Sequence, residues 1–96
     1  MIVSFADKGT EDLFQGNETK ASRGIPRTIW RPALLRLDAL DAARVLSDLR
    51  FPPGNRLEAL KGRRSGFHSI RINNQFRLIF RWSDGNAHDV EITDYH

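Results

Sequence analysis

The sequence contains no cysteine, which excludes disulfide bonds and thiolate metal sites. This absence leaves the compartment open but fits the cytosol, so we expect a cytoplasmic protein. Residues 1–14 have neither a basic start nor a long apolar run, and we expect no signal peptide and no membrane-spanning segment. No repeat or linker interrupts the 96 residues, a length typical of one domain, so we expect a single domain over residues 1–96.

The sequence also lacks the motifs of several kinds of chemistry. It has no glycine-rich phosphate loop and no nucleophile elbow. Its three histidines, His68, His88 and His96, do not have metal-ligand spacing on one element. We therefore expect no bound metal ion and no other cofactor.

Positive charge is only mildly in excess of negative charge. Lysine and arginine together number 15 against 12 acidic residues, which gives a formal net charge of +3 at neutral pH. Such an excess is compatible with a polyanionic partner but does not identify a nucleic acid by itself. Arginines outnumber lysines by 12 to 3, and the planar guanidinium group suits phosphate. A bias in codon composition explains the same imbalance equally well.

The first quarter of the chain predicts a short strand and a short helix. Residues 2–5, Ile-Val-Ser-Phe, are typical of a β-type opening. Thr10 is expected to cap a short helix, because polar side chains with an oxygen favour the residue before the first turn. Gly16 and Asn17 are expected to end that helix.

Helical spacing continues through residues 25–50. Apolar residues recur from Ile25 to Leu40 at helical spacing and predict a core-facing stripe. Pro32 lies inside this pattern and either kinks the helix or marks its true start. Asp41 is expected to cap a following helix, which residues 51–54, Phe-Pro-Pro-Gly, would end.

From about residue 56 the spacing of apolar residues changes from the helical period to a period of two residues, which is typical of strands. Residues 67–82 predict a hairpin around residues 73–75, followed by a turn at 83–86 and a last strand at 88–93. This order of elements predicts an α+β fold, with N-terminal helices packed on one face of a curved, mostly antiparallel β-sheet.

The two faces of the predicted hairpin differ in kind. Its apolar residues share one face only if the loop has an odd number of residues, because directly opposed residues point to the same side. A loop of three residues pairs Ile72 with Phe76, Ile70 with Leu78, and Arg71 with Arg77. Arg71, Arg77 and Arg81 then lie on the face away from the core, which we call the arginine face.

The arginine face has two explanations, a solvated basic surface or an anion site. Opposed like charges destabilise a strand pair by roughly 0.2–1 kcal/mol. A purely structural surface would place acidic residues between the arginines, and we expect no acidic residues between them on this face. Strands are rigid supports for a binding site, so the pattern favours an anion site. Lys61, Arg63 and Arg64, just before the hairpin, are expected to add positive charge.

Residues 90–96, VEITDYH, place proton-carrying side chains at the end of the last strand. If this strand lies beside the hairpin, Asp94, Tyr95 and His96 approach the edge that holds the arginines. Histidine exchanges protons readily near neutral pH. Cations that hold phosphate, together with a proton-transfer group, favour phosphoryl transfer or RNA cleavage, in which the 2′-hydroxyl is the nucleophile.

Three stretches in order resemble the HigB-type toxins of the RelE/ParE superfamily of bacterial toxin–antitoxin systems. They are PPGNRLEALKG (52–62), SIRINNQFRLIFRW (69–82) and VEITDYH (90–96), and the resemblance extends to the opening IVSFADKGTEDLF. It implies a small α+β toxin that cleaves translated mRNA in the A site of the 70S ribosome and so inhibits translation. It also implies neutralisation by a HigA-type helix-turn-helix antitoxin, with operator DNA bound only through the toxin–antitoxin complex.

The resemblance also suggests roles for individual residues. Arg77 matches a phosphate-binding and transition-state residue, and Asp94, Tyr95 and His96 match the catalytic end of the family. Lys61 and Arg71 are implied to contact RNA or stabilise charge, and Arg81, Arg63 and Arg64 are further substrate-binding candidates by their charge.

Glu58 lies where some relatives have a histidine that is discussed as an acid–base residue. Either Glu58 or His96 would therefore take the 2′-hydroxyl proton, or Glu58 would only pair with an arginine. The expected activity is that of a metal-independent endoribonuclease with 2′,3′-cyclic phosphate products.

Two alternative functions are compatible with membership of the same superfamily. A ParE-like protein inhibits DNA gyrase by binding and cuts no RNA, but such a binder has no need of paired arginines and a Tyr-His pair. The other alternative is an inactive module that retains only antitoxin binding.

Overall fold

The computed structural model describes residues 1–94, which form two α-helices, five short 3₁₀ turns and four strands. In chain order these are α1 (Lys8–Phe14), η1 (Ser22–Gly24), η2 (Arg27–Ile29), α2 (Trp30–Ala42), η3 (Leu46–Arg50), η4 (Pro53–Asn55), β1 (Glu58–Ala59), η5 (Gly62–Arg64), β2 (Phe67–Arg71), β3 (Phe76–Ser83) and β4 (Asn86–Asp94). Within this part of the chain, neither helix has the length and apolar character needed to cross a membrane.

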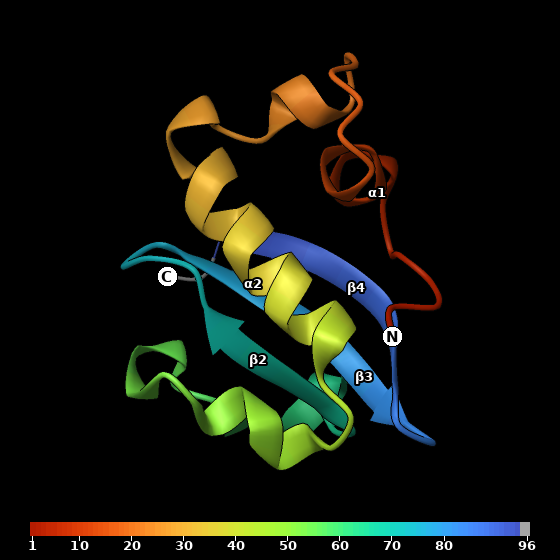
Figure 1. Cartoon of the computed structure of the whole chain (residues 1–96), viewed down its shortest axis with the longest axis vertical. Coiled ribbons are helices and arrows are strands. Elements are labelled where there is room, and N and C mark those ends of the chain that lie inside the picture. The colour runs from red at the N-terminus through yellow and green to blue at the C-terminus, as the bar shows by residue number, and fades with distance from the viewer. Residues whose placement is uncertain (95–96) are drawn as a thin grey trace.

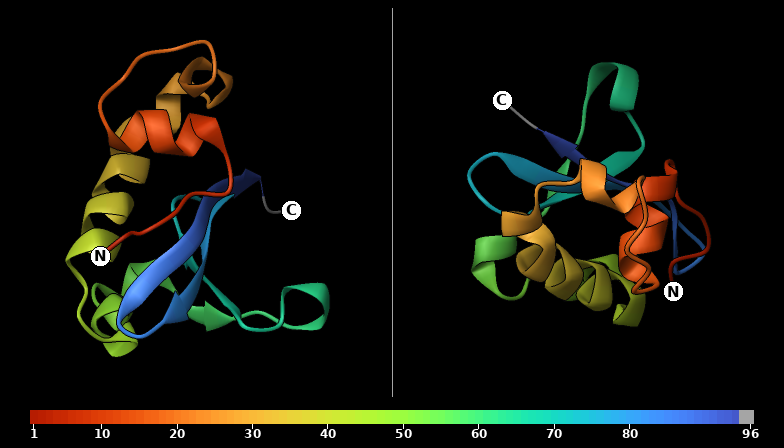
Figure 2. Two further views of the ribbon diagram at one scale, coloured as in Figure 1. Left: turned by 90° about the vertical axis from the view of Figure 1, so that its right-hand side faces the viewer. Right: turned by 90° about the horizontal axis from the view of Figure 1, so that it is seen from above.

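The strands form one sheet in the order β1-β2-β3-β4, and each neighbouring pair is antiparallel. Helix α2 lies across one face of the sheet, and α1 packs against α2 and β4 (Figure 1). In Figure 2 (left), the turn at residues 62–64 projects on the side away from the helices. The α+β architecture predicted from the sequence is confirmed.

The N-terminal segment covers the outer edge of β4. Ile2 and Phe5 form isolated parallel bridges with Ala87 and Val90. The backbone N–H of Ile92 donates to the Thr10 hydroxyl at 3.1 Å, so a side chain of α1 continues this cover. Unpaired strand edges invite association with other chains, and these contacts satisfy the edge of β4 internally.

The core lies between α2 and the sheet. Ala33, Leu37 and Leu40 are buried on one side of α2, as the helical spacing predicted. They pack with Leu78 and Phe80, which are fully buried on β3. Pro32 is the third residue of α2, so the proline marks the true start of the helix and does not kink it.

The capping residue predicted for the first helix was wrong. Asp7 is the N-cap of α1, and its Oδ1 accepts a hydrogen bond from the Thr10 N–H at 2.7 Å. An N-cap side chain reaches the third N–H of the helix, so Asp7 satisfies a donor that a cap at residue 10 would leave unpaired. Gly16, with φ of +78°, follows the last turn as predicted.

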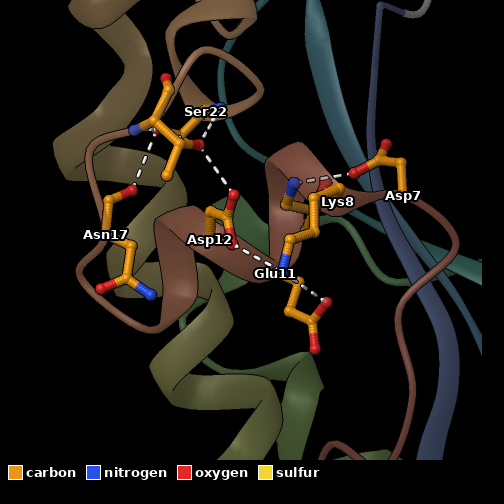
Figure 3. A network of polar contacts seen from close by, with 8 residues as sticks. Asp7, Lys8, Glu11, Asp12, Asn17 and Ser22 are labelled. Carbon is orange, nitrogen blue, oxygen red and sulfur yellow. Dashed lines mark hydrogen bonds and ion pairs between the residues drawn. The ribbon is translucent and has the colours of Figure 1, made fainter.

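Asp12 fastens α1 to the loop that follows it (Figure 3). Asp12 is only 2% exposed, and its carboxylate accepts a hydrogen bond from the Thr19 hydroxyl at 2.7 Å and lies 3.2 Å from Lys8 Nζ. The Thr19 hydroxyl and Lys8 hold the pKa of Asp12 below its ordinary value, against the opposing effect of burial. The Ser22 hydroxyl donates to the Asn17 carbonyl at 3.0 Å and closes the same loop.

The helix predicted after Asp41 was also wrong. Asp41 lies inside α2, and its Oδ1 accepts from the Ile2 N–H at 2.9 Å, so it fastens the N-terminal segment. The next element is the short 3₁₀ turn η3, in which Asp48 Oδ2 accepts from the Arg44 N–H at 2.9 Å. Asp48 thus supplies the capping oxygen that we assigned to Asp41.

Candidate functional site: an arginine pocket at the hairpin end

The hairpin of β2 and β3 has the register that the sequence predicted. Arg71 lies opposite Arg77 and Ile70 opposite Leu78, and the Ile72 N–H donates to the Phe76 carbonyl at 3.0 Å. In the loop, Asn73 Oδ1 accepts from the backbone N–H groups of residues 75 and 76, at 2.8 and 2.7 Å. The asparagine therefore closes a three-residue loop and places two arginines directly across the strands.

A pocket of about 320 Å³ lies at this end of the hairpin. Its lining is made of arginine and asparagine side chains, namely Arg56, Arg71, Asn73, Asn74 and Arg77. We call these five residues the arginine pocket. The volume is near the lower end of the range for small-ligand sites, and guanidinium and amide groups supply donors suited to an anion.

Arg77 is held from two sides. Its Nη2 donates to the Arg56 carbonyl at 2.8 Å, and its Nη1 lies 3.6 Å from Glu58 Oε1. The Arg77 side chain is 12% exposed and the Glu58 side chain 53%, so the carboxylate borders solvent while the guanidinium lies deeper. Pairing of β1 with β2 places Glu58 opposite Ser69, on the arginine face. These two contacts fix the plane and direction of the Arg77 guanidinium group.

Arg71 is held by its own loop and by helix α2. Its Nη2 contacts Asn74 Oδ1 across the hairpin loop. Its backbone carbonyl accepts a hydrogen bond from Arg36 Nε at 2.9 Å, which joins α2 to the end of β2. The helix layer therefore supports the strand end that carries Arg71.

The end of β4 lies beside the hairpin loop, as predicted for Asp94. Asp94 pairs with Phe76, and its Oδ2 accepts from Gln75 Nε2 at 2.9 Å. Thr93 lies opposite Arg77. The other two members of the predicted catalytic end, Tyr95 and His96, lie outside the described residues.

The other predicted cations do not line the arginine pocket. Arg81 lies opposite Phe67 at the far end of the hairpin, where its Nε is 3.5 Å from Asp89 Oδ2. Arg64 in η5 has its Nη1 3.3 Å from Glu91 Oε1. Lys61 and Arg63 are exposed. The sequence therefore predicted two members of the pocket, Arg71 and Arg77, and four cations that lie elsewhere.

The expectation of an arginine face without acids was wrong. Glu58, Asp89 and Glu91 pair with Arg77, Arg81 and Arg64, respectively. The acids come from the flanking strands β1 and β4, whereas the prediction considered only the two strands of the hairpin.

The middle of the arginine face is closed by apolar packing. Ile79 lies on β3 between Arg77 and Arg81 and is fully buried, although it is not on the core side. Leu60 follows β1 and is also buried. Arg64 reaches from η5 to Glu91 on β4, so the segment after β1 crosses this face. The middle of the face is therefore covered. The arginine pocket lies at its hairpin end, and the Arg81 side chain at the far end is 43% exposed beside Asp89.

Arg56, Asn73 and Asn74 line the pocket, and none of them was among the predicted site residues. The asparagines were recognised only as a turn. Arg56 follows Pro-Pro-Gly-Asn, a turn sequence that signals an unusual backbone but not the direction of the next side chain. Within residues 1–94, no group of three or more His, Asp or Glu side chains is placed to hold a metal ion.

Comparisons with known proteins agree with this architecture. A family model described as "RelE-like toxin of type II toxin-antitoxin system HigB" matches residues 3–96. The chain is 47% identical over 87 residues to Toxin HigB-1 of Vibrio cholerae, covering 91% of this chain and 90% of that protein. It is 33% identical over 96 residues to Endoribonuclease HigB of Proteus vulgaris, covering 100% of both chains.

Solved structures of other toxins have the same fold. The toxin–antitoxin complex YoeB–YefM from Staphylococcus aureus includes a chain matched with a TM-score of 0.61 at 16% identity, covering 100% of this chain and 98% of that one. A YafQ variant from E. coli matches with a TM-score of 0.62 at 11% identity, covering 98% and 93%. The family match and the sequence relatives together establish that this chain belongs to the HigB-like family, the RelE-like toxins of type II toxin–antitoxin systems.

Proposed function

We propose that this chain is a ribosome-dependent endoribonuclease that cleaves translated mRNA in the A site and so inhibits translation. The observation that carries the proposal is the arginine pocket, with Arg71 and Arg77 opposed at the hairpin end beside the end of β4. The relative from Proteus vulgaris is named an endoribonuclease, which supports the same class of reaction.

In the proposed reaction, RNA supplies its own nucleophile. The 2′-hydroxyl loses a proton to His96 or Glu58, and its oxygen attacks the adjacent phosphorus. The bond from phosphorus to the 5′-oxygen breaks, and the departing oxygen takes a proton from the other acid–base group. The products are a 2′,3′-cyclic phosphate and a 5′-hydroxyl, and the reaction needs no metal ion.

The arginines stabilise the charge that develops on the phosphate. Arg77 is already oriented by Glu58 and by the Arg56 carbonyl, so little reorganisation is needed when charge builds up. Arg71 or Lys61 adds a second cation, Asp94 supports the loop through Gln75, and Tyr95 orients the nucleotide. Arg63, Arg64 and Arg81 serve as outlying contacts to the RNA backbone.

Dependence on the ribosome follows from the modest strength of this chemistry. An acid or base contributes typically ~10²–10⁴ in rate, whereas correct positioning contributes about 7–11 kcal/mol in favourable cases. A ribosome that presents mRNA in one geometry supplies the positioning. We therefore propose that free RNA is a poor substrate.

The proposed partners are an antitoxin and the translating 70S ribosome, both in the cytoplasm. The structure of YoeB with YefM is a toxin–antitoxin complex, which supports an antitoxin partner for a chain of this fold. We propose a HigA-type helix-turn-helix antitoxin, with operator DNA bound only through the complex and with no role for a membrane.

Mapping mRNA 5′ ends after brief induction tests the proposed function against its alternatives. Cleavage at codon positions within translated messages supports the ribonuclease. A DNA-damage response without cleavage would instead identify a gyrase inhibitor. Absence of both effects, with antitoxin binding intact, would identify an inactive binding module.

A further inference from the structure

We propose that Arg56 is a phosphate-binding residue of the arginine pocket, and that its backbone carbonyl positions Arg77 for the same anion. The inference deepens the proposed function, on which it rests for the identity of the anion as a phosphate of single-stranded RNA. Its two parts concern different atoms of one residue, so a substitution can remove the side chain and leave the carbonyl in place.

The backbone of Arg56 is unusual. Its φ of 47° and ψ of 58° place it in the left-handed region, which residues with a side chain adopt rarely. From this conformation its carbonyl accepts the 2.8 Å hydrogen bond from Arg77 Nη2. A left-handed non-glycine residue persists when its surroundings determine it, and such residues are common at binding sites.

Asn55 supplies those surroundings. It is 1% exposed, and its Nδ2 donates to the Leu49 carbonyl at 3.2 Å and to the Phe51 carbonyl at 3.1 Å. The backbone N–H groups of Asn55 and Arg56 donate to the carbonyls of Pro52 and Pro53, at 2.9 and 3.2 Å. A hydrogen-bonded turn, anchored by the buried side chain of Asn55, therefore determines where the Arg56 carbonyl points.

The side chain of Arg56 differs from the other two pocket arginines. Arg71 contacts Asn74, and Arg77 contacts Glu58. The Arg56 guanidinium lines the pocket, is exposed, and makes no hydrogen bond or ion pair within residues 1–94. Its five N–H donors therefore remain available to a ligand.

The charge balance of the pocket favours an anion. Three arginines line the pocket, and among residues 1–94 the carboxylate of Glu58 lies 3.6 Å from one of them, Arg77. An arginine with a purely structural role would be expected to donate to a carbonyl or carboxylate of the fold, and the Arg56 side chain does not. A phosphodiester oxygen, which accepts several charge-assisted hydrogen bonds, matches these donors.

Substitutions at position 56 separate the side chain from the backbone. Arg56→Gly removes the guanidinium but favours a positive φ, so the carbonyl that holds Arg77 is retained. Arg56→Lys keeps the charge. Arg44→Ala is the control for net charge, because Arg44 lies near Gly85 in the β3–β4 turn, at the opposite end of β3 from the pocket.

The test is the salt dependence of binding between the purified full chain and a short 2′-O-methyl RNA, which cannot be cleaved. The slope of log K against log salt changes by about 0.7 for each phosphate contact to a single strand. We expect Arg56→Gly to flatten the slope by about 0.7, Arg56→Lys to restore most of it, and Arg44→Ala to leave it close to that of the unsubstituted chain.

An unchanged slope in folded Arg56→Gly, or no salt-dependent RNA binding by the unsubstituted chain, would overturn the inference. If Arg56→Gly does not fold, Arg56→Asn, which also tolerates the left-handed region, gives the same comparison. An unchanged slope together with cleavage of translated mRNA contradicts only the role of Arg56. A flattened slope without cleavage by the unsubstituted chain contradicts only the ribonuclease.

Discussion

The opposed pair Arg71 and Arg77 predicts that a change at the pocket will stabilise the fold while it impairs RNA cleavage. Arg71→Thr removes one of two like charges that lie directly across β2 and β3. Such pairs destabilise by roughly 0.2–1 kcal/mol, and the hydrogen bond to Asn74, which the substitution breaks, is exposed and offsets little of the gain. The hydrogen bond from Arg36 goes to the backbone carbonyl of residue 71, so the substitution leaves it intact.

The expected gain is measurable in a chain of 96 residues. A change of 1 kcal/mol shifts the melting temperature of a domain this size by about 4–8 °C, so Arg71→Thr should raise it by roughly 1–8 °C. Calorimetry at low salt and at about 1 M salt gives a second readout, because screening weakens the repulsion that the substitution removes. The increase should therefore be largest at low salt.

Arg81→Thr is the matched control on the same face. Arg81 lies opposite Phe67 on β2 and His88 on β4, and its Nε is 3.5 Å from Asp89 Oδ2, so its removal costs an attractive contact and relieves no opposed arginine. We expect its melting temperature to stay the same or fall slightly. Destabilisation by Arg71→Thr, or an equal gain in both variants at both salt concentrations, would refute the reasoning about opposed charges.

Individual contacts give three further predictions. Arg77→Lys keeps the charge but not the fork that joins Glu58 to the Arg56 carbonyl, and we expect loss of growth arrest with an unchanged far-ultraviolet circular dichroism spectrum. Glu58→Gln should lower the single-turnover cleavage rate by ~10²–10⁴ if Glu58 is the general base, and a decrease of less than tenfold would assign that role to His96. Burial lowers the pKa of His68, so the unfolded chain binds a proton more readily than the folded one. The free energy of unfolding should therefore fall as the pH drops below about 6.5 toward the lower pKa that His68 has in the folded chain. Urea titrations at several pH values should show a smaller fall in the His68→Phe variant than in the unsubstituted chain.

The sequence determined the hairpin because the rule behind it is local. Side chains alternate along a strand, so the requirement that the apolar residues share a face demanded an odd number of loop residues. A loop of three residues at 73–75 then pairs Arg71 with Arg77, as observed. The stripe on α2 followed from helical period in the same way, and Pro32 at its start agrees with one of the two interpretations of that residue.

The missed features depend on contacts between distant parts of the chain. Asp41 has a residue type typical of caps, but a tertiary hydrogen bond to Ile2 takes its carboxylate. The acids that pair with the arginine face come from strands outside the hairpin. Arg56 enters the pocket because a buried asparagine and a left-handed backbone direct it there, and neither is visible in spacing or periodicity.

The central claim is that mRNA is cleaved where the ribosome presents it. Its most direct test is incubation of the purified chain with one mRNA, either free or bound to programmed 70S ribosomes, followed by mapping of the new ends. The account predicts cleavage at the A-site codon on the ribosome, with 2′,3′-cyclic phosphate and 5′-hydroxyl ends, and little cleavage of free mRNA. Intact mRNA on the ribosome, or equal cleavage of free and bound mRNA, would contradict it.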